Sequence, residues 1–72
     1  MIYPIYYKKE LCCSQVEYKM RTSDVSAVFV KTQNGKEVQR SVVTLPTKEE
    51  FDAHLHGFVP VVEKDTNGVF GG

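Results

Sequence analysis

One helix organises the fold that we predict, and it lies in the stretch LPTKEEFDAHLHGF, residues 45–58. Thr47 can cap the first helical turn through its hydroxyl, and Glu50, three residues later, completes a capping box. Gly57 stands where a left-handed residue ends many helices. The stretch therefore predicts a helix over residues 48–56.

A β-hairpin is predicted directly before this helix. Residues 25–32 and 37–45 are rich in β-branched side chains, and the turn between them contains Asn34 and Gly35. Both residues tolerate the positive φ of a type I′ turn, which makes this pair the strongest short hairpin signal. Neither arm is strictly apolar on one face and polar on the other, so we expect the hairpin to be central in the sheet.

Three further segments complete the predicted sheet. Residues 2–8 form a strand in which Pro4, lacking an N–H, indicates a sheet edge or a strand end. Residues 58–63 form a short strand that Pro60 again places at an edge. Residues 10–21 are ambiguous, because a short helical stripe fits them. Their later part alternates apolar and polar side chains and no cap precedes it, so we favour a strand.

The chain has 72 residues, which is enough for one small domain. We predict an α+β domain over residues 1–68, with a C-terminal tail over 69–72. An antiparallel sheet of four to five strands carries the helix on one face; if residues 10–20 are helical instead, the order becomes the ferredoxin-like βαββαβ. On the helix and after it, Phe51, Leu55 and Phe58 are expected to pack against Val16, Met20, Val28, Val30 and Val43.

Composition limits the class of protein. A hydrophobic fraction of 42% and a charged fraction of 25% are typical of a soluble globular domain. No apolar run approaches the roughly 20 residues of a membrane-spanning helix, and the N-terminus lacks the order of a signal peptide. Cys12 and Cys13 are adjacent, which favours free thiols over a disulfide framework. We therefore expect a cytoplasmic protein that has no membrane partner.

The residues that could carry chemistry do not form a site in the sequence. His54 and His56 are two apart on the predicted helix, so their side chains diverge and cannot ligate one ion together. Cys12 and Cys13 lack zinc-site spacing and an activating neighbour, and we expect them to be buried as small hydrophobic residues. The sequence thus predicts no metal site, no cofactor, no catalytic residues and no enzymatic activity.

Charge is unevenly distributed along the chain although its sum is zero. Residues 1–45 hold seven basic and four acidic side chains, whereas residues 46–72 hold two basic and five acidic ones. The basic half also contains all four tyrosines. A basic sheet face with exposed aromatic side chains can stack on nucleic-acid bases, so single-stranded nucleic-acid binding is an alternative function.

Protein recognition is the leading prediction. Amphipathic aromatic side chains are enriched at protein interfaces, and proline-marked strand edges can pair with a partner strand or with a second copy as a homodimer. We expect the functional surface to lie on the sheet face that the helix leaves uncovered. The candidate partner-binding residues are Tyr3, Tyr6, Tyr7, Lys8, Lys9, Tyr18, Lys19 and Arg21.

The expected function is that of a non-enzymatic intracellular interaction module, which occludes or bridges a partner protein. Its small size is typical of phage or mobile-element regulators that inhibit a host protein, in which case it would act in the host cytoplasm. A further alternative comes from Gly71 and Gly72, which resemble the end of ubiquitin-like modifiers and small sulfur carriers. That resemblance implies activation of a C-terminal glycine as an acyl-adenylate.

Overall fold

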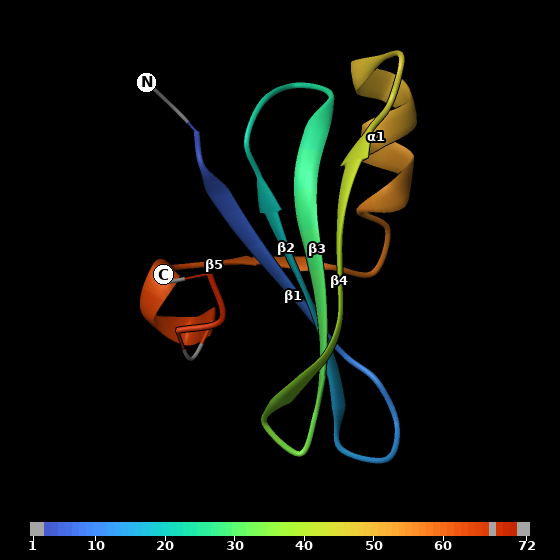
Figure 1. Ribbon diagram of the computed structural model, residues 1–72. Helices are drawn as coiled ribbons and strands as arrows, with labels where there is room; N and C mark the ends of the chain where they lie inside the picture. The colour runs from blue at the N-terminus through green and yellow to red at the C-terminus, as the bar shows by residue number, and fades with distance from the viewer. Residues whose placement is uncertain (1–2, 67, 71–72) are drawn as a thin grey trace.

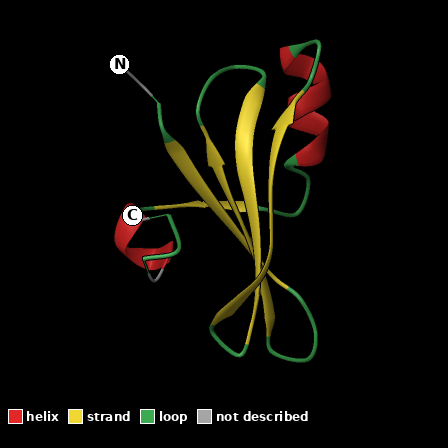
Figure 2. Cartoon of the chain, in the orientation of Figure 1, coloured by secondary structure: helices red, strands yellow, loops and turns green. Residues whose placement is uncertain are grey.

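The computed structural model describes residues 3–66 and 68–70 and shows a five-stranded antiparallel sheet with one α-helix and one 3₁₀ helix (Figure 1). The strands are β1 (Ile5–Glu10), β2 (Gln15–Arg21), β3 (Ser26–Gln33), β4 (Lys36–Thr44) and β5 (Val59–Val61). The helices are α1 (Lys48–His54) and the 3₁₀ helix η1 (Glu63–Thr66). The predicted small α+β fold is confirmed (Figure 2).

The strand order is β4-β3-β2-β1-β5. The first four strands follow one another as a meander, and β5 returns after α1 to pair with the free side of β1, where Tyr6 faces Val61. Pro60 therefore lies in an edge strand, as predicted, and Pro4 precedes β1. The predicted central hairpin is wrong for one arm, because β3 is internal while β4 forms the other edge.

The ambiguous segment is a strand over Gln15–Arg21. It pairs with β1 on one side and β3 on the other, so its backbone groups are satisfied by two neighbours. The ferredoxin-like alternative, which required a helix over residues 10–20, is not confirmed.

The hairpin turn has the geometry that its sequence predicts. Asn34 and Gly35 have φ values of 54° and 81°, as a type I′ turn requires. The register then shifts, because Thr32 faces Glu37 while Lys31 faces Gln39. One extra residue, Val38, therefore forms a β-bulge in β4.

Helix α1 begins as predicted and ends slightly earlier. The Thr47 hydroxyl accepts a hydrogen bond of 3.1 Å from the Glu50 amide, which caps the first turn. The helix ends at His54 rather than at residue 56, and Gly57 has the expected left-handed conformation, with φ of 85°.

Helix α1 packs on the sheet face opposite to the one that the apolar pattern suggested. Cross-strand pairing places Arg21, Ala27 and Val43 in one row, and the Phe51 ring of α1 lies 4.5 Å from the Arg21 guanidinium. We call this side the helix face. Of the five sheet residues expected beneath the helix, only Val43 shares this face, and the other four lie on the opposite one: Val16, Met20, Val28 and Val30. The prediction failed because the aliphatic stems of lysine and arginine can cover apolar surface as well.

The opposite side is covered by the C-terminal segment, and we call it the tail face. Its centre is Tyr18 beside Val30, both buried. The Phe70 ring packs at 5.8 Å from the Tyr6 ring, and the Arg40 guanidinium donates to the Val69 carbonyl at 3.0 Å. The predicted tail thus begins on the sheet, while Gly71 and Gly72 lie outside the described residues.

Candidate functional site

The eight candidate partner-binding residues do not form one surface. The tail face carries Tyr6, Lys8 and Tyr18. The helix face carries Tyr7, Lys9, Lys19 and Arg21. Tyr3 lies before β1, where its hydroxyl donates to the Asp24 carboxylate. The expectation of one uncovered aromatic and basic face therefore does not match the geometry, although partner binding by single members stays a prediction.

Three of the candidates are buried. Tyr18, Lys19 and Arg21 expose 2%, 4% and 5% of their surface. A side chain that stacks on a base or inserts into a partner must be accessible. These three residues instead hold the fold together.

Lys19 joins the sheet to the end of α1. Its ammonium donates to the His54 carbonyl and lies 4.4 Å from the Phe29 ring centre and 4.1 Å from that of Phe58. A cation at a helix C-terminus complements the helix dipole, and aromatic faces attract it as well. Burial lowers the pKa of Lys19 from its ordinary value. The ammonium therefore acts as a structural cation between two rings.

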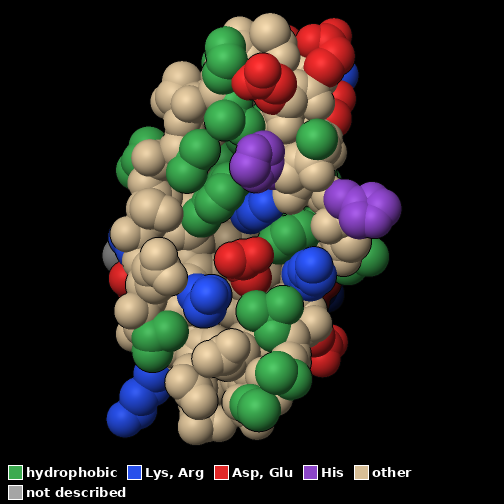
Figure 3. Space-filling view, turned by 90° about the vertical axis from the view of Figure 1, so that its right-hand side faces the viewer, with side chains coloured by type: hydrophobic (Ala, Val, Ile, Leu, Met, Phe, Trp, Pro, Cys, Tyr) green, Lys and Arg blue, Asp and Glu red, His purple; other side chains and the backbone are tan. Residues whose placement is uncertain are grey.

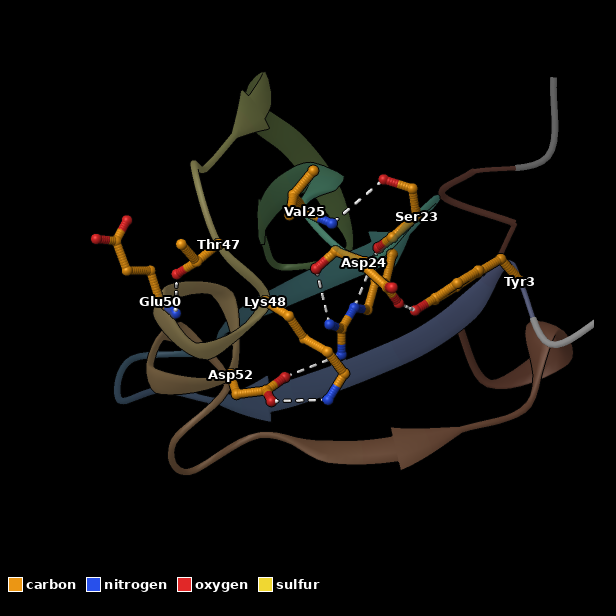
Figure 4. Close-up of polar contacts among 9 residues, drawn as sticks. Tyr3, Ser23, Asp24, Val25, Thr47, Lys48, Glu50 and Asp52 are labelled. Atoms are coloured by element: carbon orange, nitrogen blue, oxygen red, sulfur yellow. Dashed lines mark hydrogen bonds and ion pairs between the residues drawn. The ribbon is translucent and has the colours of Figure 1, made fainter.

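Arg21 joins β2 to both the following turn and the helix. Its guanidinium donates to the carbonyls of Ser23 and Asp24 at 3.2 and 2.9 Å. It also lies 3.1 Å from the Asp52 carboxylate, on α1 (Figure 4). These contacts within the chain use the planar fork of donors with which an arginine could recognise a phosphate or carboxylate of a partner.

Asp52 is held between two cations. Besides Arg21, Lys48 donates to its carboxylate at 3.2 Å, one helical turn away. The hydrogen bond from Lys48 and the charges of Lys48 and Arg21 hold the pKa of Asp52 below its ordinary value. Asp52 therefore ties α1 to β2 through Arg21, and to the first residue of its own helix through Lys48.

The groups with catalytic or metal-binding potential are scattered. The two histidine side chains lie apart on the molecular surface (Figure 3). Within residues 3–66 and 68–70, no three His, Cys, Asp or Glu side chains gather as a metal site. Cys12 and Cys13 are free and exposed in the β1–β2 turn, so the expectation that they are buried is wrong. Figure 3 also shows basic and acidic side chains interspersed on this side rather than as a patch of one sign.

The surface that the sequence did not indicate is the outer edge of β4. Eight of its nine residues are exposed, and only Val43 is half-buried. Val42 exposes 75% of its surface, although it is a large apolar side chain. The charged residues Lys36, Glu37 and Arg40 within this valine-rich strand were the available signal, because edge strands tolerate charge where central strands do not.

The backbone of β4 presents unused hydrogen-bonding groups to solvent. The Leu45 amide donates to the Val25 carbonyl at 2.7 Å, so Val25 and Leu45 form a hydrogen-bonded pair. In an antiparallel ladder such pairs alternate with pairs that are not hydrogen-bonded. By that alternation Val43 and Ser41 bond inward to β3, whereas the amides and carbonyls of Arg40, Val42 and Thr44 point outward. The regular part of the edge therefore offers three residues to an added strand.

An apolar row crosses the tail face and ends at this edge. The register aligns one residue from each strand, in the order Val61, Tyr6, Met20, Val28 and Val42. Beside Met20 lies an open depression of about 320 Å³, whose lining also includes Tyr3, Pro4 and Thr22. Val42 is thus the uncovered end of a row that crosses the whole sheet.

No family model, curated protein or solved structure matches this chain. No helix in the described ranges is both long and apolar enough to cross a membrane. The β4 edge and the two sheet faces are therefore the features of this protein that bear on its function.

Proposed function

We propose that the protein is a non-enzymatic interaction module that binds by strand addition at the outer edge of β4. The observation that carries this proposal is the exposed edge itself, with eight of nine residues accessible and three pairs of outward backbone groups. Unpaired strand edges are templates for extended segments of another chain. Backbone hydrogen bonds would supply affinity, and the side chains at alternate positions would supply specificity.

The chemistry of the edge defines the segment that fits it. Val42 requires an apolar or small side chain opposite, because its exposed surface is then removed from water. Arg40 is already paired with Glu37 at 2.8 Å, so the segment needs no compensating acidic residue there. We therefore expect an uncharged, β-branched or small-polar strand as the ligand.

The test is the substitution Val42→Pro. Because the Val42 amide points away from β3, proline removes an outward donor without removing a bond of the β3–β4 ladder. We expect the variant to fold and to lose the partner that the unmodified protein retains. Retention is measured by affinity capture with mass spectrometry, and folding by circular dichroism and thermal unfolding.

The matched control is Val42→Thr, which keeps the amide and the β-branched shape and should retain the partner. Capture that survives Val42→Pro in a folded variant contradicts the proposal. The nucleic-acid alternative replaces the proposal under one result. The protein then captures nucleic acid, the capture weakens steeply as salt rises, and reversing the charges of Lys8 and Lys9 abolishes it.

A further inference from the structure

We infer that the strand added to β4 is β4 of a second copy of this chain, paired antiparallel with Val42 opposite the partner's Val42. This inference rests on the proposed function, because it names the ligand of the same edge. Four properties of β4 carry it: the phase of its backbone groups, the alternation of its side chains, its charges, and the way in which its regular part ends.

The outward-pointing backbone groups of Arg40, Val42 and Thr44 select the register. With Val42 at the twofold axis, Val42 faces its copy and Arg40 faces Thr44 on either side, so every outward-pointing residue meets another one. Three hydrogen-bonded residue pairs result. A register centred on Ser41 leaves Thr44 opposite the bulged Val38, and one centred on Val43 brings Arg40 opposite Pro46, which has no N–H.

The side chains agree with the same register. A register centred on a residue keeps the tail face of one copy continuous with the tail face of the other. The apolar row that ends at Val42 then continues through the partner's Val42 into a second row of the same composition. Val42, 75% exposed in one chain, becomes the centre of a ten-residue row across both sheets.

Electrostatics do not oppose this pairing. Arg40 faces a threonine, and Ser41 faces Val43, so no like charges are opposed across the axis. The formal net charge of the chain is zero at pH 7, and long-range repulsion between two copies is therefore small.

The edge is also limited in length, which closes the assembly at two copies. The bulge at Val38 interrupts the ladder on one side, and Pro46 follows the strand on the other. The opposite sheet edge, β5, has three residues and contains Pro60. An isologous pair uses up the one long regular edge that residues 3–66 and 68–70 form, so the geometry gives a dimer rather than a filament.

The experiment is sedimentation velocity of the full chain at tens of micromolar, with Val42→Arg and a matched control. Arginine at position 42 places two like charges against each other at the axis, and we expect the dimer to become a monomer. The control is Val59→Arg, the same change on the other edge strand, at a valine that is 56% exposed. It should leave the dimer intact.

The register is tested by cross-linking with Val42→Cys in a Cys12→Ser/Cys13→Ser background. A hydrogen-bonded antiparallel pair separates its Cα atoms by about 5.5 Å, which a disulfide can span. Oxidised glutathione should therefore yield a covalent dimer. Val38→Cys in the same background should not, because this register puts its two copies more than about 20 Å apart.

The outcomes separate this inference from the proposed function. An unmodified chain that stays monomeric, or a dimer that persists in Val42→Arg, overturns the inference. If the chain is monomeric while Val42→Pro still abolishes capture of another protein, strand addition survives and only the identity of its ligand changes. If neither assembly nor capture depends on residue 42, both proposals fail.

Discussion

At the scale of single residues, Lys19 shows how a cation can replace an apolar contact under a helix. Its ammonium is buried between the Phe29 and Phe58 rings and donates to one backbone carbonyl. Burial makes the charged form costly, and the lowered pKa of Lys19 reflects this. The stem of the side chain therefore contributes packing, while the cost of burying the charge offsets what its carbonyl and ring contacts contribute.

Replacing Lys19 by methionine separates these two contributions. We expect Lys19→Met to keep the packing and to change the free energy of unfolding at pH 7 by between about 0 and +2 kcal/mol. Lys19→Ala, which removes the packing too, should lower it by about 1–3 kcal/mol. Urea unfolding measures both. Because the pKa of Lys19 is lowered in the folded state, the advantage of methionine should shrink as pH rises toward 10.5. A methionine variant less stable than the alanine variant would contradict this account.

Asp52 gives a dependence on acid pH. Its pKa is lowered in the folded protein, so the carboxylate contributes stability above its unfolded pKa of about 3.8, and this is lost as pH falls further. We expect Asp52→Asn to lower the melting temperature at pH 7, with a difference that narrows below pH 4. The control is Glu10→Gln, an exposed carboxylate at the end of β1 and away from the helix dipole, which should melt like the unmodified protein at both pH values. If Asp52→Asn lowered the melting temperature equally at pH 3 and pH 7, the charge of Asp52 would not contribute to stability.

At the scale of elements, the β3–β4 turn depends on the left-handed backbone of Gly35. No atom lies within 4 Å of an added Cβ there, so a substitution changes backbone conformational energy alone. We expect Gly35→Ala to lower the free energy of unfolding by about 1–2 kcal/mol, and Gly35→Asn to cost less, because asparagine tolerates this conformation. Chemical denaturation of the two variants checks the order. Equal losses would mean that the turn is not held in this conformation.

The elements also show what sequence can and cannot predict. The turn at Asn34 and the cap at Thr47 were predictable because a few adjacent residues determine them. The face that α1 covers was not predictable. The side chains on either face of β2 can be buried, because lysine and arginine have long aliphatic stems. Lys19 and Arg21 fill the helix face only because Phe51, Phe58 and the end of α1 meet them there.

At the scale of the whole molecule, the C-terminal segment links distant strands. Phe70 packs on Tyr6 of β1, and the neighbouring Val69 carbonyl accepts from Arg40 of β4. We expect Phe70→Ala to lower the free energy of unfolding by about 1–2 kcal/mol, because a half-buried ring contact is lost. The control is Val62→Ala, at an exposed valine, which should change little. Unfolding curves that coincide for Phe70→Ala and the unmodified protein would show that this contact does not stabilise the sheet.

The candidate binding residues also show that local sequence does not predict how strands pair. Tyrosines and lysines in the first half of the chain indicated a binding face, but strand order and register distributed them over both sides of the sheet. The valine-rich composition of β4 indicated a central strand, whereas the return of β5 to β1 left β4 at the edge. Long-range pairing decides both features. The charges of β4 were a local indication of an edge, but no local pattern encodes which strand pairs with which.

The alternation along β4 has a consequence for the exchange of its amide hydrogens with solvent deuterium. In a single copy the amides of Ser41 and Val43 bond inward and should exchange slowly, whereas those of Arg40, Val42 and Thr44 should exchange almost as fast as in an unfolded chain. Any strand added to this edge would slow the fast set and leave the slow set nearly unchanged. Capture of a ligand could thus be followed residue by residue, as the loss of this alternation in protection along β4, and dissociation on dilution as its return.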